Sequence, residues 1–273
     1  MLKRLALTLC LGLALAAAPP KGILVIVGGG GTTPEIEQAF LQACGGKGAR
    51  IGIIPTASSE PDGALAGWKK DLDPLGITMI PLDVRVREDS SKAELLAAAK
   101  SCTGFWFSGG DQSRIGDKIV GTPLHKLLLD KYQEGAGVGG TSAGAAIMAR
   151  AMLTGEDLNG KEQLVEMGPG AYRTREGMGF LPERIHIDQH FLRRSRENRM
   201  LSLIMGDPGA LGFGIDEATA LIVKEGVAQV EGRRGVLVFD SRDMVLKGES
   251  FRDLRLHFLR RGQAIDLKTR KLQ

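Results

Sequence analysis

The sequence lacks the features that mark several specialised protein classes. Aromatic residues make up only 5% of the 273 residues, three cysteines occur, and the formal net charge is +4. Charged residues are interspersed except for a basic cluster near the C-terminus, which is too little for a nucleic-acid-binding protein. We also find no repeats, low-complexity tracts or domain linkers. What remains is the composition of a globular chain that is long enough to bury a full core.

The N-terminal segment has the layout of a secretory signal peptide. A short positive region ends at Arg4, the apolar run LALTLCLGLALAAA follows, and small residues precede Pro19. The run is too short for a comfortable membrane span. We therefore expect residues 1–18 to be a signal peptide and residues 22–273 to form a single α/β domain. The mature protein would be exported, periplasmic or extracellular, and would keep no stable membrane anchor.

Two cysteines, Cys44 and Cys102, remain in the chain after such a cleavage. An exported protein could pair them in a disulfide. Both follow helix-like segments, however, and they could equally be buried free thiols. The sequence leaves both readings open.

Strand-like and helix-like segments alternate through the first half of the chain. Apolar runs predict strands at 22–28, 50–55, 77–84 and 104–110, and helices fit between them. This order predicts a doubly wound, mostly parallel sheet. Beyond residue 185 the pattern predicts one more strand, a helix over Leu192–Met205 and then antiparallel strands at the C-terminal edge of the sheet.

The glycine run Gly28–Gly31 resembles a phosphate-binding loop, because Thr32, Thr33 and Pro34 next to it suit a helix start. No Walker lysine follows, and the G-x-G-x-x-G spacing is missing. Nucleotide binding is therefore disfavoured.

The segment Gly137–Arg150, GVGGTSAGAAIMAR, is the centre of the predicted chemistry. It contains the G-x-S-x-G pattern of a nucleophile elbow, in which Ser142 sits on a sharp turn between a strand and a helix. Such a turn is strained, so small residues must flank the serine. The helix-forming run after Ser142 predicts free backbone N–H groups beside its hydroxyl.

A serine needs a base to take its proton. The segment Ile185–Phe191 alternates like a strand, which places His186, Asp188 and His190 on one face. We prefer His190 as the base because it ends the strand, where catalytic groups collect. The same three residues could instead bind a metal ion, but no further histidine or cysteine has a suggestive spacing, so we expect no metal.

An α/β-hydrolase arrangement is a second possibility. It would combine Ser142 with an acid such as Asp240 or Asp243 and with the late His257. An HGGG-type oxyanion loop is missing from the sequence, and too few βα units follow Ser142. Both points count against this arrangement.

Several stretches together resemble cyanophycinase and its relative dipeptidase E, a family of serine peptidases. They are FSGGDQ at 107–112, GGTSAGAAIM at 139–148, GMGFLPE at 177–183, DQHF with RSRENRM at 188–200, and GFGIDEATAL at 212–221. The resemblance covers most of the chain after Gly22. It implies a flavodoxin-like sheet related to class I glutamine amidotransferases, and no cofactor.

By this resemblance Ser142 is the nucleophile and His190 the general base. Glu156, in a G-E context after the elbow helix, would be the acid that orients the imidazole, with Asp157 as the fallback. N–H groups of Ala143 and of Gly109 or Gly110 would stabilise the oxyanion. Polar side chains at the same sheet edge are candidates for substrate binding: Asp111, Gln112, Asp188, Gln189, Arg194 and Arg196.

Cyanophycin is poly-aspartate with arginine joined to each side-chain carboxyl group, and cyanophycinase releases β-aspartyl-arginine from it. The resemblance implies this activity. A peptidase E-type dipeptidase for aspartyl or isoaspartyl peptides and a non-catalytic peptide-binding protein are the alternatives. Family members often carry an acidic, lysine-containing loop after the first strand, where this chain has GGGGTTPE. Many are dimers, so a homodimer is a partner to consider, although no part of the sequence shows an interface.

Overall fold

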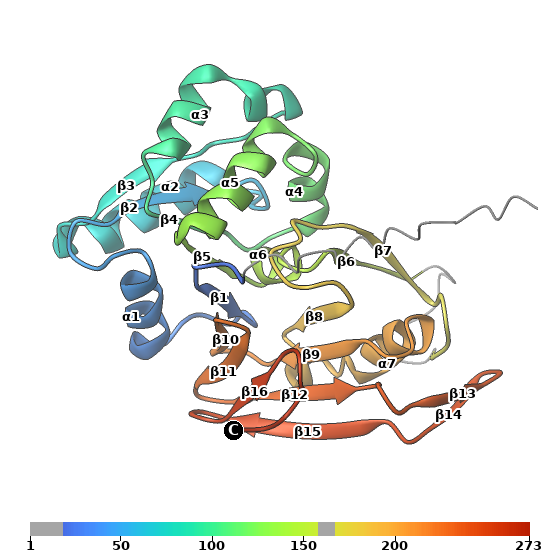
Figure 1. Cartoon of the computed structure of the whole chain (residues 1–273). Helices are drawn as coiled ribbons and strands as arrows, with labels where there is room; N and C mark the ends of the chain where they lie inside the picture. Colours follow the sequence, from blue (N-terminus) through green and yellow to red (C-terminus); the bar gives the residue numbers. More distant parts are fainter. Residues whose placement is uncertain (1–18, 158–166) are drawn as a thin grey trace, which may run out of the picture.

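The computed structural model describes residues 19–157 and 167–273, with the side chains of Glu156 and Asp157 left out (Figure 1). The predicted signal peptide, residues 1–18, therefore lies outside the described residues. Among the described residues, no helix has the length and apolar character needed to cross a membrane.

An eight-stranded sheet forms the centre of the protein, in the order β16-β11-β10-β1-β5-β4-β2-β3. Five neighbouring strands are parallel. They are β1 (Leu24–Val27), β5 (Gly137–Thr141), β4 (Gly104–Phe107), β2 (Arg50–Ile54) and β3 (Thr78–Pro81). Three antiparallel strands extend the sheet beyond β1. They are β10 (Thr219–Lys224), β11 (Val227–Gly232) and β16 (Ala264–Asp266). The predicted mostly parallel sheet with antiparallel C-terminal strands is confirmed.

Helices cover both faces of this sheet, as the alternation of strands and helices predicts (Figure 1). In β1, Leu24 and Ile26 belong to one apolar cluster, whereas Val25 and Val27 belong to the other. The first cluster includes side chains of α4 (Gln112–Lys118), α5 (Pro123–Glu134) and α6 (Ala143–Ala146), with α3 (Ala93–Lys100) beside α5. The second packs against α1 (Pro34–Ala43) and α2 (Pro61–Leu72). Short 3-10 helices η1 (Asp73–Leu75) and η2 (Arg87–Ser91) complete this half.

A second, four-stranded sheet was not foreseen from the sequence. Its order is β15-β12-β9-β8, and only β8 and β9 are parallel. The bounds are β8 (Ile185–Gln189), β9 (Leu211–Ile215), β12 (Gly235–Asp240) and β15 (Arg255–Arg260). Helix α7 (Glu197–Gly206) packs on this sheet around Phe191, Phe239 and Met200. The C-terminal strands thus divide between two sheets.

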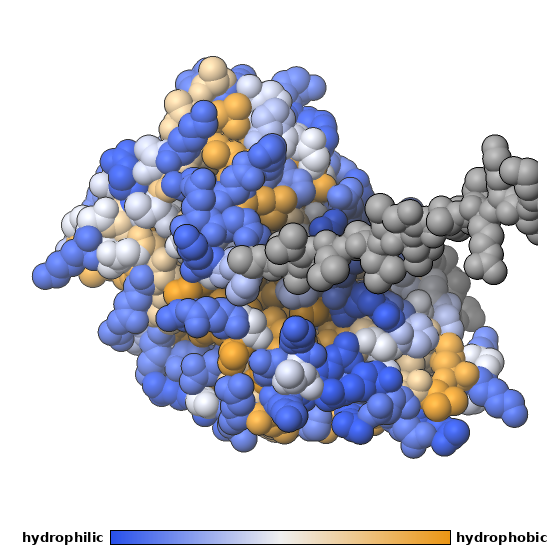
Figure 2. All heavy atoms as spheres, viewed as in Figure 1, coloured by the Kyte–Doolittle hydropathy of each residue, from blue (hydrophilic) through white to orange (hydrophobic). Residues whose placement is uncertain are grey.

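Two hairpins complete the described chain. They are β6 (Ala151–Asp157) with β7 (Tyr172–Glu176), and β13 (Val245–Lys247) with β14 (Ser250–Arg252). The face seen in Figure 2 is mainly hydrophilic, with scattered apolar patches, one of them over the β13–β14 hairpin.

Two predicted helices are shorter in the structure. The helix after Ser142 has only four residues, because the segment that follows bonds to another part of the chain: Met178 N donates to Ile147 O at 2.8 Å and Phe180 N to Met148 O at 3.0 Å. The helix expected over Leu192–Met205 is interrupted at Ser195, whose φ is 48°. A 3-10 turn, η3 (Leu192–Arg194), therefore precedes α7.

Both cysteines of the described chain are free and buried. Burial raises the pKa of Cys44 to about 12 and that of Cys102 to about 11. Of the two readings left open by the sequence, the structure has free thiols that stay protonated at neutral pH.

Candidate active site

Ser142 occupies a strained turn between β5 and α6. Its backbone has φ 53° and ψ −110°, outside the ordinary region for a residue with a side chain. Two positions before and after the serine only glycine fits: a Cβ on Gly140 would lie 2.4 Å from Gly144 O, and one on Gly144 would lie 2.2 Å from Phe107 O. The predicted strand–turn–helix geometry of a nucleophile elbow is therefore present.

A chain of hydrogen bonds leads from this serine to a carboxylate. His190 Nε2 lies 3.0 Å from Ser142 Oγ, and His190 Nδ1 lies 2.7 Å from Glu217 Oε1. His190 directly follows β8 and has φ 49°, so it leaves the strand direction and turns toward Ser142. This is the order of groups through which a base activates a serine hydroxyl.

Among the described side chains, Glu217 is the carboxylate at the imidazole. A ring nitrogen makes one in-plane hydrogen bond, and Glu217 occupies that position at Nδ1. Glu217 thus occupies the position that the sequence prediction gave to Glu156. The side chains of Glu156 and of the fallback Asp157 lie outside the described residues.

The strand order of the second sheet explains how Glu217 reaches His190. It lies two residues past the end of β9, and β9 runs parallel to β8 with Gln189 opposite Ile215. Residues after two neighbouring parallel strands meet at one sheet edge, so His190 and Glu217 become neighbours. The preceding Asp216 is held elsewhere, since it accepts hydrogen bonds from Arg193 N at 3.1 Å and from the Arg234 side chain at 3.3 Å.

The glycine run at Gly28–Gly31 supports this pair. A Cβ on Gly29 would lie 2.4 Å from His190 Nε2, and one on Gly30 would lie 2.6 Å from Glu217 Cβ. The backbone carbonyl groups of the run also hold the chain around this pair, because Gly28 O accepts from His190 N at 2.7 Å and Gly29 O from Ala218 N at 2.8 Å. The glycines let the chain pass directly over the imidazole. Their presence therefore has a structural reason that does not involve nucleotide binding.

Three backbone N–H groups near Ser142 are available for an oxyanion. In the part of the chain that the structure describes, the N–H groups of Gly109, Gly110 and Ala143 donate to no acceptor. Gly109 lies beside the nucleophile, since a Cβ there would be 3.5 Å from Ser142 Cβ. Gly110 has φ 136° and passes close to Ala57, which excludes a side chain.

Two of the residues predicted to bind substrate have structural contacts instead. Asp188 is 1% exposed and forms a two-pronged ion pair with Arg199, whose Nε donates to Oδ2 at 2.6 Å. Gln112 is 7% exposed, and its Nε2 donates to Leu153 O at 2.9 Å and to Thr154 O at 3.1 Å. These contacts fix α7 and β6 around the site, so the assignments of Asp188 and Gln112 to substrate binding are corrected.

The other four residues predicted to bind substrate differ in their exposure and in their distance from Ser142. Gln189 Oε1 is 3.5 Å from Ser142 Oγ. Arg196 donates to Gln189 O at 2.6 Å, and burial lowers its pKa to about 10. Arg194 is exposed and pairs with no carboxylate of the described residues. Asp111 is exposed and caps α4 by accepting from Ser113 N at 2.8 Å.

The Asp188–Arg199 pair gives a first testable prediction. Replacing Arg199 by leucine removes both hydrogen bonds of this pair and leaves the buried carboxylate of Asp188 with Arg196, at 3.6 Å, as its cationic partner, which should lower the free energy of unfolding by about 3 kcal/mol. Urea denaturation followed by circular dichroism measures the change. The exposed Arg194→Leu variant is the matched control and should unfold at the wild-type urea concentration. Equal stability of both variants would contradict the structural role of Arg199.

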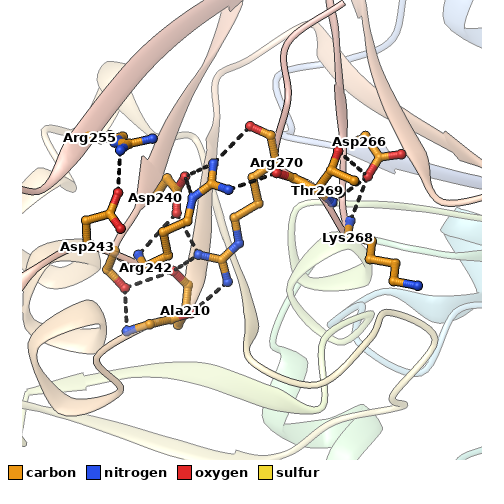
Figure 3. Close-up of polar contacts among 11 residues, drawn as sticks. Ala210, Asp240, Arg242, Asp243, Arg255, Asp266, Lys268, Thr269 and Arg270 are labelled. Carbon is orange, nitrogen blue, oxygen red and sulfur yellow. Dashed lines mark hydrogen bonds and ion pairs between the residues drawn. The ribbon is translucent and has the colours of Figure 1, made fainter.

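The α/β-hydrolase arrangement is not present. Figure 3 shows that Asp240 is held by Arg242 and Arg270, with Arg270 Nη1 at 2.6 Å, while Asp243 pairs with Arg255. His257 lies on β15 opposite Val238. The alternative metal site is not formed either: His186 pairs with Asp207 at 3.1 Å, and no group of potential metal ligands occurs among the described residues.

The environment of His190 favours its neutral form. Burial is the main cause that lowers its pKa below the ordinary value of 6.5, and the positive charges of Arg194 and Arg196 act in the same direction. The hydrogen bond that Glu217 accepts from the imidazole, together with its negative charge, opposes this shift but does not cancel it. At neutral pH the imidazole is therefore ready to accept a proton.

The chain as a whole is similar to known peptidases. Residues 23–230 match the family described as Peptidase family S51. The chain is 35% identical to a cyanophycinase of Synechococcus elongatus over 93% of its own length and 81% of that protein. It is 34% identical to a cyanophycinase of Geminocystis herdmanii over 86% and 89%. A crystal structure of a peptidase from an acI-B1 Actinobacterium has a TM-score of 0.68, with 25% identity, 90% of this chain and 96% of that chain covered.

Proposed function

The chain belongs to peptidase family S51, and on that premise we propose that it is a cyanophycinase-type serine peptidase in which Ser142, His190 and Glu217 form the catalytic triad. The observation that carries the triad is the continuous hydrogen-bonded chain from Ser142 Oγ through His190 to Glu217. The similarity to cyanophycinases over most of their length supports the substrate.

The reaction follows from the positions of these groups. Ser142 Oγ attacks the backbone carbonyl carbon of the poly-aspartate while His190 Nε2 accepts its proton. Glu217 stabilises the imidazolium. The N–H groups of Ala143 and Gly109 bind the oxyanion of the tetrahedral intermediate. His190 then donates the proton to the departing amine, leaving an acyl-enzyme on Ser142, and a water molecule activated by the same imidazole hydrolyses that ester.

We further propose that the protein acts outside the cytoplasm. The support is the layout of residues 1–18, with a positive start, an apolar core and small residues before Pro19. N-terminal sequencing of the protein from its native host tests this, because a mature chain that begins near residue 19 is expected. A chain that retains Met1 would contradict export by this route.

Product analysis tests the substrate. The chain without residues 1–18, incubated with cyanophycin, should release β-aspartyl-arginine, which mass spectrometry identifies. Short aspartyl and isoaspartyl dipeptides are the comparison substrates. Cleavage of the dipeptides alone would instead support the peptidase E-type activity, and binding of cyanophycin without any product would support a non-catalytic peptide-binding protein.

The pKa of His190 predicts the acid limb of the pH profile. Since the pKa lies below 6.5, kcat/KM should fall only at a pH below that value, where the base becomes protonated. Arg194→Gln removes a positive charge that disfavours the imidazolium, so the pKa should rise and the acid limb should move to higher pH. Measuring kcat/KM from pH 4 to 8 for both proteins checks this. An unchanged acid limb in the variant would contradict the assignment of that limb to His190.

A further inference from the structure

A groove of about 750 Å³ opens beside the nucleophile. Gly109 and Thr141, which are neighbours of Ser142 in space and in sequence, line its inner end. From there it runs between α1 and α2, and its walls include Phe40, Trp68 and Trp106. The triad and the arginines after β8 do not line it, so the mechanism above leaves the groove without a role.

The walls of the groove combine aromatic faces with charged groups at the rim. The rings of Trp68 and Trp106 lie 5.1 Å apart, tilted by 56°, and Phe40 meets Trp106 edge-on at 4.8 Å. Three exposed charged side chains line the same space: Glu37, Lys70 and Asp71. None of these three forms an ion pair with another residue in the described parts of the chain, and Glu37 accepts a hydrogen bond from the Thr32 hydroxyl group.

An unpartnered polar atom lies at the inner end of this groove. Ser108 is 6% exposed and lines the groove, yet its buried Oγ has no hydrogen-bond partner. A buried hydroxyl without a partner is costly.

We propose that this groove is the subsite for one arginyl side group of the substrate, with the guanidinium held between the Trp68 ring and the carboxylates of Glu37 and Asp71. The proposal rests on the proposed cyanophycinase activity. An aromatic face attracts a guanidinium through its negative quadrupole, and carboxylates bind it through charge-assisted hydrogen bonds. The apolar walls suit the three methylene groups of the side chain.

Lys70 fits the same ligand. In cyanophycin each arginine is attached through its α-amino group, so its carboxylate and its guanidinium both remain free. A side group with both charges matches a groove that carries Glu37 and Asp71 together with Lys70. A purely acidic ligand would instead meet two unpaired carboxylates at the rim.

Tryptophan fluorescence reads this binding directly, because the chain has only two tryptophans and both line the groove. The Ser142→Ala variant binds without turnover and is titrated with a β-aspartyl-arginine oligomer and with the same oligomer carrying citrulline, which is neutral and nearly isosteric. We expect a saturable fluorescence change and an affinity about tenfold higher for the arginine oligomer, from one cation–π contact and two ion pairs.

Charge variants identify the groups responsible. In the Ser142→Ala background, Glu37→Gln with Asp71→Asn should abolish the preference for arginine over citrulline. Glu35→Gln with Asp73→Asn makes the same charge change at residues that do not line the groove, and this variant should keep the preference for arginine. The proposal is overturned if calorimetry detects binding while the fluorescence stays constant, or if the Glu37/Asp71 double variant keeps the wild-type preference.

These measurements remain separate from the test of the activity. If the wild-type protein hydrolyses cyanophycin but the Glu37/Asp71 double variant keeps the preference for arginine, the subsite alone is overturned. If the wild-type protein does not hydrolyse cyanophycin but the binding preference for arginine depends on Glu37 and Asp71, the proposed activity is overturned and the groove remains an arginyl-binding site.

Discussion

Ser142→Ala is expected to lower the rate of cyanophycin hydrolysis by about 10⁶-fold, the usual consequence of removing a serine nucleophile from an intact triad. The hydroxyl is the only group lost, and both residues carry a Cβ at the strained φ of 53°. The fold should therefore be unaffected. Release of β-aspartyl-arginine, followed over hours at high enzyme concentration, gives the residual rate.

Ser113→Ala, on α4, is a suitable control for this substitution, because it also removes a hydroxyl group near the carboxyl ends of the parallel strands. It should keep the wild-type rate. Circular dichroism and the melting temperature verify that both variants are folded. A folded Ser142→Ala protein with more than a few per cent of the wild-type rate would show that another group attacks the substrate.

The second large effect is expected for Glu217→Gln, which should lower kcat by about 10³–10⁴-fold. The amide is nearly isosteric, but its N–H donor can hold the imidazole in the wrong tautomer, and it cannot stabilise the imidazolium. Glu217 also raises the pKa of His190. Any residual activity should therefore have its acid limb at a lower pH than the wild-type protein. Steady-state kinetics across the pH range measure both quantities.

Glu156→Gln separates the two assignments of the acid. The structure has Glu217 at His190 Nδ1, so Glu156→Gln should retain activity within a few-fold of the wild-type protein. The reverse result, a large loss for Glu156→Gln and a small one for Glu217→Gln, would restore the assignment made from the sequence. Asp157→Asn completes the set, and we expect it to behave like Glu156→Gln.

The sequence predicted those parts of the site that short local patterns encode. Ser142 could be placed because the small residues around it are those that a sharp turn between a strand and a helix requires. His190 could be placed because the alternating pattern of Ile185–Phe191 ends there. The parallel half of the central sheet followed from the regular alternation of apolar runs and helices.

Features that depend on long-range pairing could not be predicted in the same way. Glu217 reaches His190 only because β8 and β9 are parallel neighbours, and nothing local to Glu217 reveals that register. The division of the C-terminal strands between two sheets likewise depends on pairing between strands that are distant in the sequence. Asp188 was predicted to bind substrate, because the sequence does not reveal its buried ion pair with Arg199, eleven positions later.

The glycine run Gly28–Gly31 shows that one sequence pattern can be compatible with two different functions. Glycines after a first strand suit both a phosphate-binding loop and a close passage over a side chain. Contact with His190 and Glu217 decides between them. The run thus contributes to the catalytic site by its lack of side chains.

The central claim, that the protein cleaves peptides through Ser142 activated by His190 and Glu217, is tested most directly by covalent labelling. A fluorophosphonate is incubated with the wild-type protein and with the Glu217→Gln variant, and tandem mass spectrometry locates the adduct. We predict a single phosphonylated residue, Ser142, with loss of hydrolysis in proportion to labelling and a much slower reaction in the variant. Labelling of another residue, or full hydrolysis by protein that is phosphonylated at Ser142, would contradict the account.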